Sequence, residues 1–188
     1  MKLRTAIVVT AILALPVAAA PQTDLFGKPD TVYAVAAQID TRNWTVTISY
    51  TNDEWVEALS LPFHLDAGDT KIVGDSAIYT GGRVEKFDFK GFRADTAIQC
   101  ITMGLMANMG PTHTGLPPGN GRLVTVFVSS LDDKPIEQLK VDTTTTHPSN
   151  SLMVMAQHIQ LTEPPDTIPA NNFDTLRIVP AFVFRKAE

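Results

Sequence analysis

Four histidines are the residues of this chain best suited to act as general bases or metal ligands: His64, His113, His147 and His158. No two of them lie two or four residues apart, and no HExxH sequence occurs, so no short-range zinc site of that kind is encoded. A catalytic triad would need one of them beside a nucleophile, but the chain has no GxSxG sequence. The sequence therefore predicts that the protein is not an enzyme. An enzyme assembled from dispersed histidines and aspartates is the weakest alternative.

Sulfur-bearing side chains recur at every third position through Cys100, Met103, Met106 and Met109. Soft sulfur ligands at close spacing can hold Cu(I). In a strand, however, Met106 faces away from Met103 and Met109, so the sulfurs do not converge. The spacing therefore favours core packing, with no metal bound, and predicts that Cys100 is a buried free thiol. As the only cysteine of the chain, Cys100 cannot form an intramolecular disulfide.

Acidic residues cluster near the predicted turns, in Asp53-Glu54, in Asp66 and Asp69, and in Asp132-Asp133. Calcium prefers carboxylate and carbonyl oxygens gathered in loops, but no DxDxDG loop is present. Turn formation and a solvated acidic surface explain the clusters equally well. We therefore expect no cofactor, and calcium stays an open alternative.

Candidate ligand-binding residues are Trp55, Asn52 and Tyr79. Trp55 follows Asn52 in a predicted loop, and Tyr79 stands at a predicted strand end, where a flat ring could stack on a ligand. The alternative for Trp55 is a hydrophobic cap on the edge of the core. Trp44 lies in phase with apolar neighbours and is expected in the core.

The elements that must position these residues are short strands. Residues 44–50 and 59–65 alternate apolar and polar side chains, the period of a half-buried strand. Because Pro62 cannot donate to a ladder, we expect its strand at a sheet edge or at a bulge. The other predicted strands cover residues 32–39, 71–79, 84–89, 97–105, 122–129, 136–141, 152–161 and 176–184. Such spacing without helices predicts an all-β protein with an antiparallel β-sandwich of about nine strands.

The first 20 residues differ from the rest. Lys2 and Arg4 precede an apolar run over residues 6–15, and small residues follow it. This order predicts a signal peptide over residues 1–20, and the run is shorter than the ~20 residues that span a membrane. Residues 21–29 are a predicted lead-in and residues 30–188 a single domain. We expect a secreted protein, with periplasm, cell surface and exterior all open.

Net charge argues against one class of partner. The chain of 188 residues carries 15 basic and 20 acidic side chains, a net charge of −5. Nucleic-acid binding needs a basic face, so we expect no nucleic-acid partner.

Residues 31–130 resemble the cohesin-like and carbohydrate-binding-module-like sandwiches of secreted bacterial proteins. The resemblance rests on the spacing in WTVTISYTN (residues 44–52), VEALSLPF (residues 56–63) and LPPGNGRLVTVFV (residues 116–128), together with Asp75-Ser76. It implies a nine-stranded jelly-roll sandwich that binds a dockerin partner or a surface polysaccharide without catalysis. The resemblance implies no individual contact residue.

Two functions follow as hypotheses. The first is a secreted non-catalytic binding module, for a protein or a surface polysaccharide, in extracellular adhesion or assembly. Its contact would lie on a strand face or on the loops at residues 52–56 and 110–121. The alternative is a self-assembling extracellular structural subunit that uses edge-strand pairing, with the strand after Pro164-Pro165 as the donated one.

Overall fold

Eleven β-strands and no helix make up the described part of the chain. The computed structural model describes residues 27–107, 109, 115–144, 152–159 and 173–187. The all-β class is therefore confirmed. The strands are β1 (Thr31–Gln38), β2 (Asn43–Asn52), β3 (Trp55–Asp66), β4 (Ile72–Ile78), β5 (Phe89–Asp95), β6 (Cys100–Met106), β7 (Gly119–Ser130), β8 (Lys140–Thr143), β9 (Met153–Ile159), β10 (Phe173–Ile178) and β11 (Ala181–Lys186).

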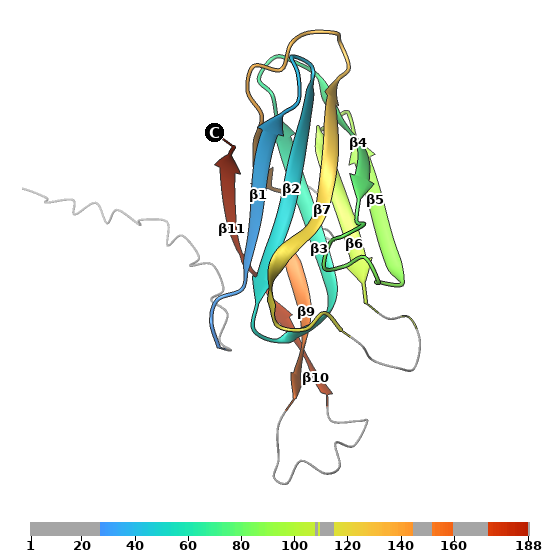
Figure 1. The fold of residues 1–188 in the computed structure, drawn as a ribbon, viewed down its shortest axis with the longest axis vertical. Helices are drawn as coiled ribbons and strands as arrows, with labels where there is room; N and C mark the ends of the chain where they lie inside the picture. The colour runs from blue at the N-terminus through green and yellow to red at the C-terminus, as the bar shows by residue number, and fades with distance from the viewer. Residues whose placement is uncertain (1–26, 108, 110–114, 145–151, 160–172, 188) are drawn as a thin grey trace, which may run out of the picture.

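Two sheets pack face to face as a sandwich (Figure 1). The five-stranded sheet has the order β11-β1-β2-β7-β4, and the six-stranded sheet has the order β10-β9-β3-β6-β5, with β8 also paired to β3. The sandwich prediction is confirmed. One pair departs from the predicted antiparallel arrangement, because β11 runs parallel to β1. The chain reaches β11 by crossing from β10 in the other sheet, so the strand direction is set by that crossing rather than by a hairpin.

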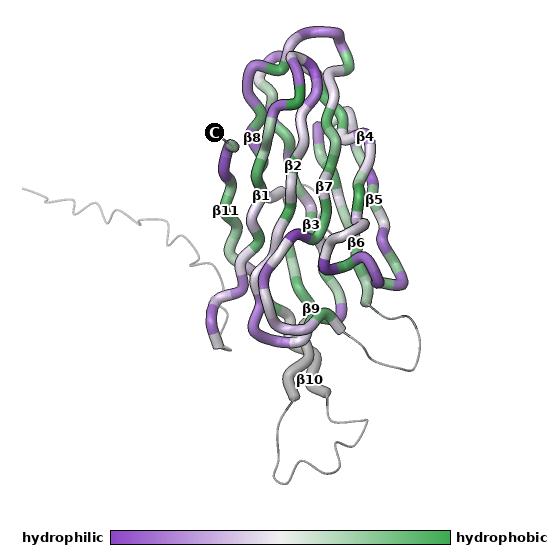
Figure 2. The backbone as a smooth tube through the Cα atoms, in the orientation of Figure 1, coloured by the Kyte–Doolittle hydropathy of each residue, from purple (hydrophilic) through white to green (hydrophobic). Residues whose placement is uncertain are grey.

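Alternation of side chains along the strands builds the core between the sheets. In β2, Trp44, Val46, Ile48 and Tyr50 are fully buried and the intervening residues are half-buried. The prediction that Trp44 is a core residue is confirmed, and its indole Nε1 donates a 3.1 Å hydrogen bond to the carbonyl oxygen of Ile136. Figure 2 shows hydrophobic residues along the strands and hydrophilic residues gathered in the turns.

Pro62 does not lie in an edge strand, because β3 is paired on both sides. On one side, β6 pairs with β3 without a break. On the other side, the pairing with β9 stops at Ser60 of β3 and the pairing with β8 starts at Phe63. Leu65 donates its N–H toward β6, and successive residues alternate, so the nitrogen of Pro62 faces the interval between β9 and β8. A proline fits inside this sheet because no partner strand needs its missing donor.

Residues 84–89 are not the predicted strand. Val84 and Phe87 are buried in consecutive turns, in which Glu85 N–H donates to the carbonyl of Gly82 and Phe87 N–H to that of Val84. Two apolar residues three apart were sufficient to imitate a strand pattern. The strand at this place in the sheet is β5, whose residues show little alternation of burial because it lies at a sheet edge.

Two other predicted strands have different bounds. Residues 176–184 split into β10 and β11, which belong to different sheets, and Pro180 lies in the break. Proline cannot continue the β10 ladder, so the chain changes sheets there. Residues 136–141 form a strand only from Lys140 onward, since Ile136 N–H instead donates to the carbonyl of Thr41.

The N-terminal predictions concern residues that are mostly undescribed. The predicted signal peptide and residues 21–26 of the lead-in lie outside the described residues. No helix in the described ranges has the length and hydropathy needed to cross a bilayer.

Candidate functional site

An apolar row crosses the outward face of the six-stranded sheet. Cross-strand register places Met155 beside Ala58, Ala58 beside Met106, and Met106 beside Phe89. Met106 and Phe89 are 42% and 44% exposed, although both are large and hydrophobic. The prediction that the methionines pack in the core holds for Met103 and is wrong for Met106 and Met109, which point out of the core. Met106 alternates with buried Met103 and Leu105, so strand geometry turns it outward.

Two glycines allow the ring of Phe89 to lie along the sheet. A Cβ atom on Gly91 would come within 2.9 Å of Cζ of Phe89, and one on Gly104 within 3.6 Å of its Cε1. The ring therefore occupies the space that two side chains would fill. This packing covers the strand backbone with an aromatic surface and leaves one face of the ring toward solvent.

Trp55 joins the same face through a bulge. It is the first residue of β3 rather than a loop residue, so the predicted loop position is corrected, and it is 40% exposed. The register of β3 against β9 shifts between Val56 and Ala58, which inserts Glu57 as an extra residue. Val56 and Leu59 can then both be buried although they are three residues apart. We call Trp55, Ala58, Phe89, Met106 and Met155 the apolar surface.

Asn52 is buried beneath the turn that leads to Trp55. Its amide nitrogen donates to the carbonyl of Glu54 at 2.6 Å and to that of Pro117 at 3.3 Å. Its amide oxygen accepts a 2.8 Å bond from Arg83 Nη1. With 5% of its surface exposed, Asn52 fixes the turn and offers a ligand almost no surface. Asn52 can therefore affect binding only indirectly, because it holds the turn that positions Trp55.

Arg83 is a positioning residue that sequence reasoning missed. Besides Asn52, its guanidinium donates to the carbonyls of Tyr50 at 3.0 Å, Gly119 at 3.1 Å and Pro117 at 2.5 Å. It therefore ties the end of β2 to the start of β7. Burial lowers the pKa of this guanidinium, and the nearby Tyr50 and Asp30 oppose that effect. Because a single arginine between two predicted strands carries no motif, nothing in the sequence singled it out.

The two loops that were predicted to carry the contact meet at this end of the sandwich. Val56 and Leu116 exchange backbone hydrogen bonds, at 2.9 and 2.7 Å. Residues 110–114 of the second loop lie outside the described residues. Tyr79 is not part of the cluster, since it follows β4 in the other sheet and packs partly against the core. Burial raises the pKa of its phenol.

Acidic residues behave mainly as turn residues. Asp66 accepts from Gly68 N–H, Asp133 pairs with Arg42, and Asp132 pairs with Lys134, which lowers the pKa of Asp132. One trio was not foreseen: Asp30, Asp53 and Glu54 place carboxylate oxygens within 4.8 Å of one another. Oxygen donors of this kind suit calcium, but Asp30 accepts from Tyr50 O–H and Asp53 from Lys28 N–H. Two of the three carboxylates, those of Asp30 and Asp53, therefore already accept hydrogen bonds within the protein, and calcium binding stays a prediction.

The histidines show no arrangement for catalysis in the described part of the chain. His64 points to the outward side of β3, beside Asp142 of β8. His113 and His147 lie outside the described residues, and His158 belongs to β9. Cys100 is a buried free thiol, as predicted, and burial raises its pKa. A raised pKa disfavours the thiolate and therefore nucleophilic chemistry.

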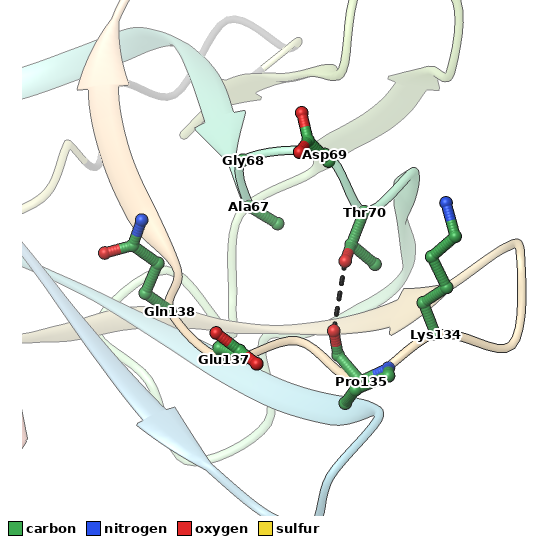
Figure 3. A pocket seen from close by; sticks show the side chains of 8 residues that line it. All are labelled: Ala67, Gly68, Asp69, Thr70, Lys134, Pro135, Glu137 and Gln138. Carbon is green, nitrogen blue, oxygen red and sulfur yellow. Dashed lines mark hydrogen bonds between the residues drawn. The ribbon is translucent and has the colours of Figure 1, made fainter.

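Two cavities lie away from the apolar surface. One, of about 420 Å³, opens between residues 67–70 and residues 134–138 (Figure 3). Thr70 Oγ1 in its wall donates to the carbonyl of Pro135 at 3.0 Å, so its hydroxyl is already used in joining the two segments. The other, of about 400 Å³, lies beside β8 and is lined partly by Phe182 and Phe184.

Comparison with known proteins connects this geometry to one fold. No protein-family model matches the chain, and no curated protein matches it significantly. Among solved structures, the seventh ScaB type I cohesin from Pseudobacteroides cellulosolvens has 7% identity and a TM-score of 0.53, over 83% of this chain and 92% of that chain.

Two further cohesins give the same result. The sixth cohesin of scaffoldin B from Acetivibrio cellulolyticus, solved with a mutant Cel5 dockerin, has 10% identity and a TM-score of 0.51, over 84% and 94% of the two chains. The OlpC cohesin in a type I cohesin–dockerin complex from Clostridium thermocellum has 9% identity and a TM-score of 0.52, over 85% and 95%. The predicted cohesin-like sandwich is therefore confirmed as the fold.

Proposed function

We propose that this cohesin-like sandwich is a secreted, non-catalytic binding module that takes a protein partner on its apolar surface. Secretion is supported by the basic, apolar and small-residue order of residues 1–20. A protein partner is supported by the solved complexes, in which cohesins of the same fold are bound to dockerins. Adhesion or assembly outside the cell is the role that these two features together favour.

The apolar surface is the observation that carries the proposal. Trp55, Met106 and Phe89 each leave at least 40% of their surface exposed on an outward sheet face. Neighbouring exposed apolar side chains mark interaction sites, and aromatic residues and methionine are enriched in protein interfaces. The opposite outward face carries threonine and serine along its central strand, with Tyr33 and Phe127 among their register neighbours and exposed Ile78 on the edge strand β4. What distinguishes the face of the six-stranded sheet is that Phe89, Met106, Ala58 and Met155 follow one another in register.

Polysaccharide is the second ligand class that the sequence left open. A sugar needs hydrogen-bonding side chains around a stacking ring, because each pyranose exposes hydroxyl groups. The register neighbours of Phe89 and Gly91 are Met106 and Gly104, and the one polar side chain directly opposite Gly104 is that of Ser60. Such a small number of hydrogen-bonding groups beside the ring favours a protein over a polysaccharide.

Quantitative capture tests the proposal. Protein immobilised on beads is incubated with the extracellular fraction of the producing organism and, separately, with insoluble cell-surface polysaccharide. We expect a protein to be retained by the wild type and lost with Met106→Lys, which puts a charge in the middle of the apolar surface. The matched control is Thr47→Lys on the opposite face, which should retain it.

Two outcomes would contradict the proposal. Equal capture by both variants would remove the apolar surface from the contact. Retention of polysaccharide in place of protein, sensitive to Met106→Lys, would replace the protein partner with a sugar. Circular dichroism of each variant confirms that the sandwich is folded.

A further inference from the structure

Four polar side chains line the cavity of about 400 Å³ beside β8, and we call them its polar rim. They come from two paired strands, because His64 of β3 lies opposite Asp142 of β8 and Asp66 lies opposite Lys140. Residues opposite each other share one face of a sheet, as do residues two apart in a strand, so the four lie together on the outward side. Lys140 and Asp142 are exposed, and His64 and Asp66 are half-buried. One cationic and two anionic groups therefore lie within a single patch.

Both carboxylates of the polar rim are held by the backbone and keep one oxygen for a ligand. Oδ1 of Asp66 accepts the N–H of Gly68 at 2.9 Å. Oδ1 of Asp142 accepts the N–H of Thr143 at 2.7 Å. Within the described residues no ion pair joins Lys140 to either carboxylate, although it lies opposite Asp66. The charges of the rim are thus held in place without neutralising one another, and a ligand can bind between them.

The wall of the same cavity is apolar. Phe182 and Phe184 of β11 contribute to it, and both rings are half-buried and pack on the core. Phe182 lies against the buried ring of Phe63, with the ring centroids 5.4 Å apart, so the core holds this ring in place. Val141 of β8 completes the wall. Apolar side chains beside a few convergent polar groups are the usual lining of a small-molecule site.

A metal ion does not fit the polar rim. In the described part of the chain, three side chains bring their ligand atoms within 4.8 Å of one another in the carboxylate trio described above, and not at this rim. His64, Asp66 and Asp142 therefore do not converge closely enough to share one ion.

Charge instead selects the class of small molecule. A ligand with one positive charge is attracted by Asp66 and Asp142 but repelled by Lys140, and a ligand with one negative charge meets the reverse. A neutral sugar offers only uncharged hydroxyl groups. A ligand that carries both an ammonium and a carboxylate would form charge-assisted hydrogen bonds with both kinds of rim group. A zwitterion with an apolar substituent therefore matches the rim and the wall best.

We propose that this cavity binds an apolar α-amino acid. The carboxylate of the ligand pairs with the ammonium of Lys140, and its ammonium pairs with the remaining oxygens of Asp66 and Asp142. Its side chain packs on the rings of Phe182 and Phe184. The volume suits such a ligand, because small-molecule sites measure about 300–1,000 Å³.

The proposed site is separate from the apolar surface. His64 lies six residues beyond Ala58 in β3, roughly 20 Å at the rise of an extended strand. A protein partner on the apolar surface and an amino acid in the cavity are therefore two independent contacts, and neither requires the other.

A set of matched small molecules tests the proposal. Leucine is added at millimolar concentrations to the isotope-labelled protein, and NMR follows the backbone amides of residues 64–66 and 140–143. We expect saturable shifts of these amides. Isoamylamine lacks the carboxylate of leucine and isocaproate lacks its ammonium, so each should bind about tenfold or more weakly. Glycine, which lacks the apolar side chain, should also bind more weakly than leucine.

Variants of the polar rim assign its two charges. Lys140→Ala should weaken leucine binding about tenfold and abolish the preference for leucine over isoamylamine, because the ligand carboxylate then has no cation to pair with. Asp142→Ala should weaken leucine and isoamylamine alike. The matched control is Glu137→Ala in the cavity of about 420 Å³, which should leave the leucine titration unchanged.

The outcomes separate the alternatives, and the amide spectra also show whether each variant is folded. Absence of leucine shifts at residues 64–66 and 140–143 would overturn the proposal. Isoamylamine or glucose binding as tightly as leucine would overturn it too, as would equal weakening by Glu137→Ala. Met106→Lys should leave the leucine titration unchanged, and Asp142→Ala should leave capture of the protein partner unchanged. Failure of this proposal and failure of the proposed function are therefore distinguishable.

Discussion

Hydrogen bonds between buried polar atoms fix the turn between Asn52 and Trp55 at the end of the sandwich. Arg83 satisfies three carbonyls and one amide oxygen there, while Tyr50 donates its hydroxyl to buried Asp30. Hydrogen bonds to charged groups stabilise more than neutral ones. The position of Trp55 on the apolar surface therefore depends on residues that a partner never touches.

Two tyrosines provide a matched comparison of hydroxyl groups. Tyr79 O–H is buried with no hydrogen-bond partner among the described residues, whereas Tyr50 O–H donates to Asp30. Tyr50→Phe should lower the free energy of unfolding by about 1–3 kcal/mol, because a buried acceptor loses its donor. Tyr79→Phe should leave it unchanged or raise it by about 0.5 kcal/mol, since an unbonded buried hydroxyl is removed.

Urea denaturation of both variants checks this comparison. Equal losses for the two phenylalanine variants would mean that Tyr79 O–H has a partner in solution, and would contradict the assignment.

Side-chain positions were predictable where strand alternation controls them. Trp44 is buried as expected, because it continues a period-two pattern. Cys100 is buried as expected too, although it is in phase with Thr102 and Met106 rather than with the buried Ile101 and Met103. Met106 was misassigned, since three methionines at regular spacing suggested a common core role. Asn52 was singled out for a ligand although it bonds to backbone 65 residues away, at Pro117. Contacts over such separations leave no trace in local sequence.

The turn over residues 80–87 contributes more to the fold than its sequence suggests. A Cβ on Gly82 would lie 2.3 Å from the carbonyl oxygen of Leu123 in β7, so the turn can approach the sheet only with glycine there. Gly82→Ala should lower the free energy of unfolding by about 1–3 kcal/mol through overpacking against rigid backbone.

The control for Gly82 is Gly68→Ala in another turn. A Cβ on Gly68 meets nothing within 4 Å, although its φ of +64° disfavours alanine. We expect Gly68→Ala to lower the free energy of unfolding by about 1 kcal/mol, from backbone strain alone. Thermal unfolding measures both variants. If Gly82→Ala destabilised the protein no more than Gly68→Ala does, the close packing of the turn on β7 would be contradicted.

Strand existence was easier to predict than strand neighbours. The patterns at residues 44–50, 59–65 and 122–129 each correspond to part of a strand, because both sheets bury one face. For Pro62 the sequence predicted an edge strand or a bulge. β3 has its bulge at Glu57 instead, and the sequence cannot show that two partner strands leave an interval opposite Pro62. The direction of β11 was also unpredictable, since it depends on a crossing between sheets.

At the scale of the whole molecule, the outward face of the six-stranded sheet carries the apolar surface. The other outward face has threonine and serine along its central strand, with Tyr33 and Phe127 beside them in register. We therefore expect a partner that binds the apolar surface to contact one side of the sandwich and to leave the other side in solvent.

Hydroxyl-radical footprinting tests the central claim most directly, because it reports the solvent exposure of individual side chains. With the captured partner bound, modification of Trp55, Phe89 and Met106 should fall severalfold, while Tyr33 on the opposite sheet should react as in the free protein. Buried Met103 serves as the check that the sandwich remains folded. Unchanged modification of Met106 and Phe89, with protection of Tyr33 instead, would contradict the account.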